Sequence, residues 1–241
     1  MKFFSGLGIP TVALAATLSI IDFYMSISYQ WFSTMYGVWF FATSMRAALA
    51  VAVIICAILG ARGYLKGIVN KGHYYDLGSM AFTFTVFWAY AVFCQYFLIY
   101  HANVPEETFW FNMRELTASG AKSSWWWFSI YCLVFGYFFL PFFALLINKN
   151  KVTVKRIVFI SCWILLFQWS DIYFNVLPRR EPAADIILGY TVRQFSVTLW
   201  DMAAIIGVGA ICLWAYVRSM QKTEPIPIRD PRIQESLHHH E

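Results

Sequence analysis

The sequence has little charge and lacks the cysteine and histidine spacings that bind common cofactors. Charged residues make up 13% of its 241 residues, about half of their share in an average globular protein. The five cysteines, at positions 56, 94, 132, 162 and 212, lie singly in apolar stretches, so no CxxC, CxxCH or disulfide framework is present. No pair of histidines falls within the apolar stretches. We therefore expect this chain to bind no haem, no iron–sulfur cluster and no metal ion.

The motifs of common soluble enzymes are also missing. The sequence contains no Walker loop, no GxGxxG motif opening a helix, and no spacing that indicates a Ser/His/Asp triad. Its net charge is +5, but the basic residues do not cluster into the groove that nucleic acid binding requires. We therefore expect neither an independent catalytic site nor a nucleic acid partner.

The chain is rich in apolar residues, at 60%, and in aromatic residues, at 20%. A helix that crosses a bilayer needs about 20 mostly apolar residues. Six stretches qualify, at about 9–28, 38–60, 78–101, 123–147, 156–177 and 194–217. We predict an all-α integral membrane protein in which residues 1–220 form a six-span domain in the lipid bilayer. Residues 221–241 are polar and contain three prolines, which predicts an extended tail.

The positive charges outside the predicted spans are distributed unequally between the two faces of the membrane. Twelve Lys and Arg residues fall on the face that carries both termini, and five fall on the other. Because cytoplasmic loops carry the excess of Lys and Arg, both termini are predicted to lie in the cytoplasm. The positive net charge therefore reflects orientation in the membrane.

Polar side chains inside the predicted spans converge on one depth. With a rise of about 1.5 Å per residue, Asp22 lies about 9 Å and Arg46 about 12 Å below the outer ends of their spans, and two further aspartates lie at roughly 9–11 Å. Ionisable groups inside a bilayer are costly and so indicate function. Carboxylates, hydroxyls and amides around one arginine suit a proton half-channel that opens to the outer face. The candidate residues for this pathway are Asp22, Ser26, Arg46, Gln95, Asp171, Tyr173 and Asp201.

A structural interpretation of this layer stays open. In it, Asp22 and Arg46 form a buried pair that holds two helices in register, and the other aspartates are wetted from the outer surface. The inner half of the membrane offers few matching groups, so the sequence shows no complete path across it.

The outer loop after the third span is predicted to contact partner subunits. It carries a turn with polar and charged side chains, followed by an aromatic run. The candidate contact residues are His101, Asn103, Glu106, Glu107 and Arg114.

Several stretches of the sequence are specific enough for comparison with a known family. They are Asp76–Tyr90 (DLGSMAFTFTVFWAY), Gln95–Thr108 (QYFLIYHANVPEET), Asp22–Ser26 (DFYMS) with Trp31–Thr34 (WFST) and Gly37, and Arg229–Leu237 (RDPRIQESL). Together, these stretches resemble the ActF subunit of bacterial alternative complex III. The matches are spread along nearly the whole chain.

This resemblance implies a multi-pass subunit of the bacterial inner membrane, with an NrfD-like four-helix bundle, as in polysulfide reductase membrane subunits. It implies a quinol:cytochrome c or quinol:electron-acceptor oxidoreductase of a respiratory or photosynthetic electron transport chain. The expected partners are a multihaem cytochrome c, an iron–sulfur protein and a paralogous NrfD-like membrane subunit. These partners would hold the c-type haems and the iron–sulfur clusters, and the complex would use a quinol. Family members usually have four further spans, so this chain corresponds to their C-terminal six-span portion.

The function expected from the polar layer and the resemblance is proton translocation coupled to electron transfer. Two alternatives stay open. In one, the chain itself forms the quinol oxidation site, and Asp22 or His101 accepts the proton. In the other, the chain is a scaffold, so that Asp22→Asn and Asp201→Asn leave turnover and proton pumping intact.

Overall fold

The computed structural model describes residues 2–28, 30–65, 67–117, 119–178, 180–182, 190–192 and 195–222. The elements in chain order are α1 (Lys2–Phe23), η1 (Met25–Ser28), α2 (Met35–Ala61), α3 (Lys71–Ala102), α4 (Pro105–Glu115), α5 (Ser124–Phe128), η2 (Ser129–Phe139), α6 (Leu140–Leu146), α7 (Asn148–Val152), α8 (Val154–Val176), β1 (Arg180–Pro182), β2 (Tyr190–Val192) and α9 (Leu199–Met220). The strands β1 and β2 pair antiparallel. The predicted tail beyond Lys222 lies outside the described residues.

Six helical stretches within the described residues are long and apolar enough to cross a membrane. They are Gly6–Ser28, Met35–Ala61, Lys71–Ala102, Ser124–Leu146, Val154–Val176 and Leu199–Met220. This confirms the prediction of six apolar helices. The fourth of them joins α5, η2 and α6, and its middle part, η2, has π-helical geometry.

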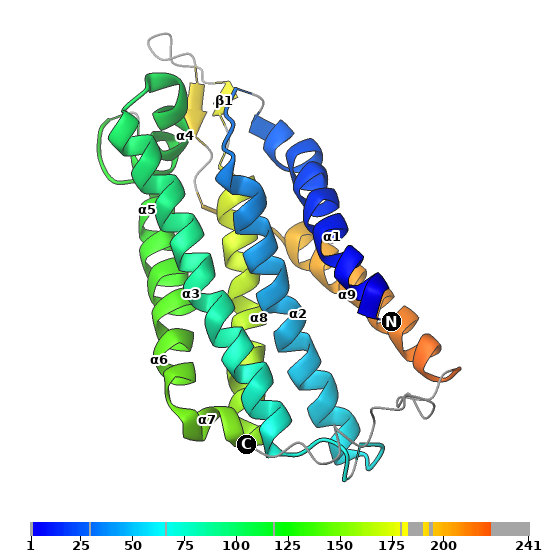
Figure 1. The fold of residues 1–241 in the computed structure, drawn as a ribbon. Coiled ribbons are helices and arrows are strands. Elements are labelled where there is room, and N and C mark those ends of the chain that lie inside the picture. The colour runs from blue at the N-terminus through cyan, green and yellow to red at the C-terminus, as the bar shows by residue number, and fades with distance from the viewer. Residues whose placement is uncertain are drawn as a thin grey trace.

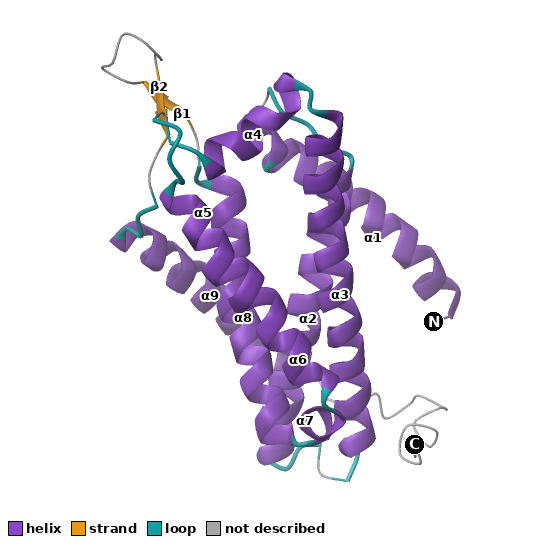
Figure 2. Cartoon of the chain, turned by 90° about the vertical axis from the view of Figure 1, so that its left-hand side faces the viewer, coloured by secondary structure: helices purple, strands orange, loops and turns teal. Residues whose placement is uncertain are grey.

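Four of these stretches pack side by side into a bundle made of α2, α3, α5–η2–α6 and α8 (Figures 1 and 2). Large apolar side chains from all four fill its core, among them Trp39, Trp88, Leu145 and Ile164. The helix α4 and the strands lie at one end of the bundle and α7 lies at the other (Figure 2). Following the predicted orientation, we call these the outer and the inner end.

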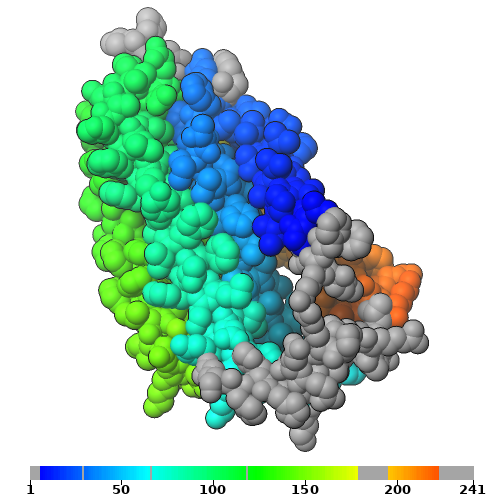
Figure 3. All heavy atoms as spheres, viewed as in Figure 1, coloured from blue at the N-terminus to red at the C-terminus, as the bar shows by residue number. Residues whose placement is uncertain are grey.

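The remaining two stretches, α1 and α9, lie outside the bundle and lean away from it (Figure 1). The upper part of α1 rests on α2 (Figure 3), where a Cβ atom on Gly37 would approach Thr17 Cγ2 to 2.6 Å. No residue of α9 is buried, and its Leu199 is 88% exposed. The apolar surfaces of both helices thus face outward, as surfaces in contact with lipid do.

Two of the spanning helices begin at other residues than predicted, because polar side chains cap their N-termini. The third span begins at Lys71 rather than at residue 78, because the Asn70 side chain accepts a hydrogen bond from the His73 backbone N–H. The sixth begins at Leu199 rather than at residue 194, because Thr198 and Asp201 form a capping box. Hydropathy alone does not register either cap.

Candidate functional site

Asp171, on α8, lies at the centre of the bundle and is 1% exposed. Its Oδ2 atom accepts hydrogen bonds from Trp39 Nε1 (3.1 Å), Thr43 Oγ1 (2.9 Å) and Trp88 Nε1 (2.9 Å). These donors come from α2 and α3, so one carboxylate oxygen ties three helices together. A buried carboxylate is costly unless it is hydrogen-bonded, and these donors reduce that cost without adding charge.

The hydrogen bonds continue from Asp171 to the fourth span. Thr43 Oγ1 lies 3.2 Å from the Tyr137 hydroxyl, and that hydroxyl donates to Gln168 Oε1 at 2.5 Å. Thr43 and Tyr137 are fully buried, whereas Gln168 is partly exposed. We call Asp171, Thr43, Tyr137 and Gln168 the polar chain. It runs from the centre of the bundle toward its side.

Asp171 is also linked toward the outer end of the bundle. The amide nitrogen of Asn175, one turn further along α8, donates to the Asp171 backbone oxygen (2.8 Å) and lies 3.5 Å from its Oδ1. Asn175 is partly exposed. The buried carboxylate therefore lies between two amides that both reach the surface of this chain.

Arg46 is fully buried on α2, one turn inward of Thr43. Its Nη2 donates to the Tyr137 backbone oxygen at 2.6 Å, and its Cζ lies 4.1 Å from the centroid of the Tyr137 ring. Its Nε and Nη1 atoms have no hydrogen-bond partner. No carboxylate of the described residues forms an ion pair with it, so a cation–π contact and one carbonyl hold this cation.

Two other predicted pathway residues lie on the opposite side of α8. The Tyr173 hydroxyl lies 3.1 Å from Asp201 Oδ2, and it also donates to the Ser196 carbonyl. The same Asp201 oxygen accepts from Thr198 N and Thr198 Oγ1, each at 2.8 Å. Tyr173 and Asp201 thus secure the start of α9 and are not hydrogen-bonded to the polar chain.

The remaining predicted pathway residues are dispersed. Asp22 and Ser26 are exposed near the outer end of the first span, where the Ser26 hydroxyl donates to the Asp22 carbonyl. The structural alternative of a buried Asp22–Arg46 pair is therefore wrong. Gln95 is buried on α3, about two turns outward of Trp88. Of the seven candidates, the structure brings Arg46 and Asp171 into the polar cluster at the centre of the bundle, and Tyr173 and Asp201 into a separate pair at the start of α9.

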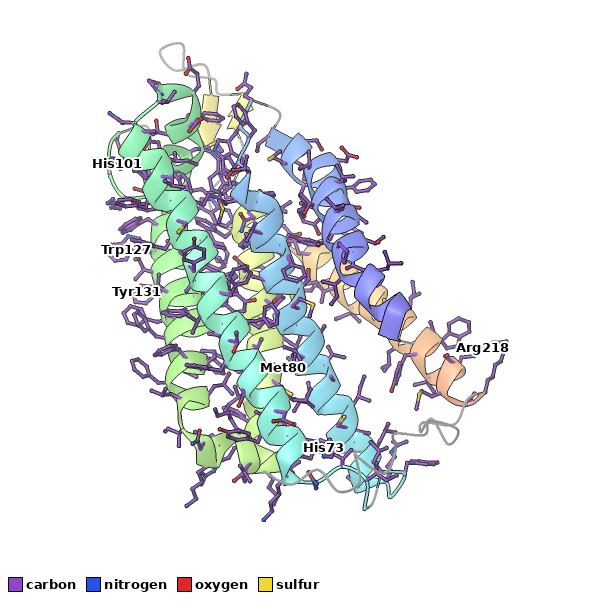
Figure 4. All side chains as sticks on the ribbon, viewed as in Figure 1. His73, Met80, His101, Trp127, Tyr131 and Arg218 are labelled. Atoms are coloured by element: carbon purple, nitrogen blue, oxygen red, sulfur yellow. The ribbon has the colours of Figure 1, made fainter. Side chains whose placement is uncertain are left out.

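The outer loop contains both exposed and buried residues. His101, Asn103 and Glu106 are exposed and Glu107 is partly exposed, around the turn between α3 and α4. His101 stacks on Phe97 and lies near the outer end of the bundle (Figure 4). These four residues remain open to a partner.

Arg114, also expected to contact a partner, is 1% exposed. Its guanidinium lies 3.3 Å from the Trp110 ring centroid and donates to the carbonyls of Phe174 (3.1 Å) and Asn175 (3.0 Å). Burial lowers the pKa of this guanidinium to about 9. Because the last carbonyls of a helix lack backbone donors, Arg114 fastens α4 to the end of α8, and it is not available to a partner.

A cleft lies between the outer end of α1 and the helices α8 and α9. It has a volume of about 370 Å³ and aromatic walls that include Phe23, Tyr24, Trp169 and Tyr173. Among the described residues that line it, Asp201 carries the carboxylate. The walls of the cleft are mostly apolar, and the cleft is open to its surroundings.

Sequence reasoning missed four residues of the central cluster, namely Trp39, Thr43, Trp88 and Tyr137. Trp39 and Thr43 lie seven and three residues before Arg46, which places all three on one face of a helix. This spacing could have identified Trp39 and Thr43 as neighbours of Arg46. Tyr137 lies in a continuous aromatic run and gives no such signal. Comparison of the whole sequence with protein-family models and with curated proteins found no match.

Proposed function

We propose that this chain is a membrane subunit of a quinol:electron-acceptor oxidoreductase of the alternative complex III type, and that its bundle carries protons. The resemblance of the sequence stretches to ActF supports the assignment to a complex. The polar chain inside the bundle supports the role in proton movement. In this proposal both termini lie in the cytoplasm of a bacterium, and the redox cofactors belong to the partner subunits.

The observation that carries the proposal is the number of hydrogens in the polar chain. Its four groups make three contacts, at 2.9, 3.2 and 2.5 Å. With Asp171 ionised and the oxygen of Gln168 facing Tyr137, only two hydroxyl hydrogens are available for these three contacts. A proton on Asp171 would supply the third by reversing the hydrogen bond between Thr43 and Asp171, so that Asp171 donates to Thr43, Thr43 to Tyr137, and Tyr137 to Gln168.

The chain of contacts is also complete when Asp171 is ionised, provided that the Gln168 amide presents its NH₂ group. Gln168 then donates to Tyr137, Tyr137 to Thr43, and Thr43 to Asp171. Binding or release of one proton, together with a turn of the Gln168 amide, thus reverses the direction of three hydrogen bonds and leaves none of the four groups of the polar chain unsatisfied. A set of side chains with two such arrangements suits a site that loads and releases one proton.

The surroundings of the polar chain fit an outer half-channel. Asn175 connects Asp171 to the outer end, but inward of Arg46 the buried positions of α2 are the apolar Leu49, Ala50 and Val53. The Thr85 hydroxyl is bonded to the Ala81 carbonyl of its own helix. The hydrogen bonds among the described residues do not continue inward from Arg46, and Gln168 is where a partner subunit would supply further groups.

A second candidate function is binding of the quinol itself, and the cleft beside α9 favours it. A quinol ring would fit between the aromatic walls, with its hydroxyl directed at Asp201. Replacing Ala204, in the wall of the cleft, by Trp would fill this space. If quinol oxidation by the complex is unchanged in Ala204→Trp, the quinol does not bind there.

The first experiment is purification of the complex through this chain, followed by mass spectrometry. Multihaem cytochromes and an iron–sulfur protein should co-purify, and a homo-oligomer without redox partners would refute the assignment. In the purified complex reconstituted into vesicles, Asp171→Asn should abolish proton release per electron while quinol turnover persists, because the amide keeps the shape but cannot ionise. Unchanged proton release would leave the scaffold interpretation.

A further inference from the structure

Two consecutive backbone carbonyls, where η2 passes into α6, are bound by side chains of other helices. The Gly136 carbonyl accepts from Trp163 Nε1 of α8 at 2.8 Å. The next carbonyl, that of Tyr137, accepts from Arg46 Nη2 of α2 at 2.6 Å. Inside a spanning helix such carbonyls are normally bound by the helix's own N–H groups.

The sequence explains why these two carbonyls are free. In α-helical geometry the Gly136 carbonyl would accept from the N–H of Leu140, but this N–H donates to Phe135, five residues back, as in a π-helix. Where α-helical geometry resumes, from Leu140, the Tyr137 carbonyl would accept from the N–H of residue 141, but this residue is a proline and has no N–H. A change of helix type releases the first carbonyl, and Pro141 releases the second.

Close packing fixes the positions of the side-chain donors. A Cβ atom on Gly136 would lie 2.2 Å from Phe167 Cε1, so only glycine allows α8 to approach η2 this closely. Phe167 stacks on Trp163 with ring centroids 4.7 Å apart. The Trp163 ring is thereby held where its N–H meets the Gly136 carbonyl.

Arg46 depends more strongly on its carbonyl than Trp163 does. The Tyr137 carbonyl is the hydrogen-bond acceptor that the structure gives Arg46, since its Nε and Nη1 atoms have none. The guanidinium also lies against the ring of Tyr137, whose hydroxyl is part of the polar chain. One carbonyl therefore holds the buried cation and the phenol in a fixed relation.

We infer that Pro141 is a positioning residue for proton transfer, because its missing N–H reserves the Tyr137 carbonyl for Arg46. An N–H at position 141 would compete with Arg46 for this carbonyl. The displaced guanidinium would leave the Tyr137 ring and turn toward the carboxyl group of Asp171 in the same cluster. The proton-transfer role of Pro141 rests on the function proposed above, whereas the displacement of Arg46 does not.

The test compares Pro141→Ala with Pro10→Ala in the purified complex. Pro10 lies inside α1, away from the bundle, and provides a matched proline control. Pro141→Ala should lose most of the proton release per electron while assembly and quinol turnover persist, and Pro10→Ala should lose none. A merely structural role would lower assembly, turnover and proton release together, and that result overturns the inference.

A density map of the Pro141→Ala complex provides a readout that does not depend on proton transfer. It should show the residue 141 N–H bonded to the Tyr137 carbonyl and Arg46 displaced. An unmoved Arg46 overturns the inference. If Asp171→Asn stops proton release but Pro141→Ala does not, the positioning role fails and the proposed function stands; if neither does, the proposed function fails.

A second variant keeps the inference testable if Pro141→Ala does not assemble. Arg46→Met retains Pro141 and most of the side-chain volume but removes the cation. It should also lose proton release per electron while quinol turnover persists. Normal proton release by an assembled Arg46→Met complex would overturn the inference.

Discussion

The two sides of α8 contain similar residues in very different settings. On the bundle side, Asp171 is buried, and its Oδ2 is bonded to two indoles and a hydroxyl that continues to Tyr137. On the side that faces α9, Tyr173 and Asp201 also form an aspartate–tyrosine pair, but Asp201 is bonded to the backbone and hydroxyl of Thr198. Two aspartates predicted at the same depth thus have different surroundings, one a link in a hydrogen-bonded chain and the other a helix cap.

Under the proposed function, the continuity of the hydrogen bonds, and not depth in the membrane, separates the proposed proton site from a helix cap. A proton site needs neighbours that both give and accept a proton, as Thr43 and Tyr137 do. A cap needs only backbone donors. Substitutions that remove one hydroxyl or add one methyl group can test whether the two sides differ as their contacts indicate.

The largest difference is expected between the two tyrosines. Tyr137→Phe removes the hydroxyl between Thr43 and Gln168 and keeps the ring under Arg46, so proton release by the complex should slow at least about tenfold. Tyr173→Phe removes a hydroxyl outside the polar chain and should leave proton release unchanged. Rates of pH change in reconstituted vesicles at matched quinol turnover provide the measurement. Equal effects of the two variants would show that the polar chain carries no protons.

Two glycines test the difference in packing between the bundle and α9. A Cβ on Gly136 would overlap the Phe167 ring, so Gly136→Ala should destabilise the protein by about 1–3 kcal/mol. No atom lies within 4 Å of a Cβ built on Gly207, and alanine favours a helix, so Gly207→Ala should change stability by no more than about 1 kcal/mol. Thermal unfolding of each variant in detergent measures the effect. A large loss with Gly207→Ala would mean that α9 packs closely against a partner.

The sequence predicted the six apolar helices because length and hydropathy are sufficient for that purpose. It also identified Arg46 and Asp171, since ionisable groups inside apolar stretches are rare. The prediction grouped residues by depth alone, and depth does not distinguish the faces of a helix. Asp171 and Tyr173 are two residues apart, which places them on nearly opposite sides of α8.

The sequence pattern of the fourth span could not have identified its functional residue. Its residues from Ile130 to Phe139 are apolar or aromatic on every side, and their π-helical geometry departs from the usual period of 3.6 residues. Tyr137 therefore looks like any other aromatic residue in the sequence. Only the positions of Thr43, Gln168 and Arg46 around it distinguish this side chain.

The smallest effect is expected at Asp201, the aspartate of the α9 cap. Asp201→Asn weakens the acceptor for Thr198, and Thr198→Ala removes the hydroxyl of the same capping box, so each should cost about 1 kcal/mol of stability. Neither variant should change proton release or quinol turnover, because the polar chain does not include the cap. Thermal unfolding and vesicle assays of the two variants together distinguish the capping role of Asp201 from a chemical role of its carboxylate. A loss of turnover in Asp201→Asn but not in Thr198→Ala would show that the carboxylate acts on a molecule in the cleft, and would move the functional centre from the bundle to the α9 side.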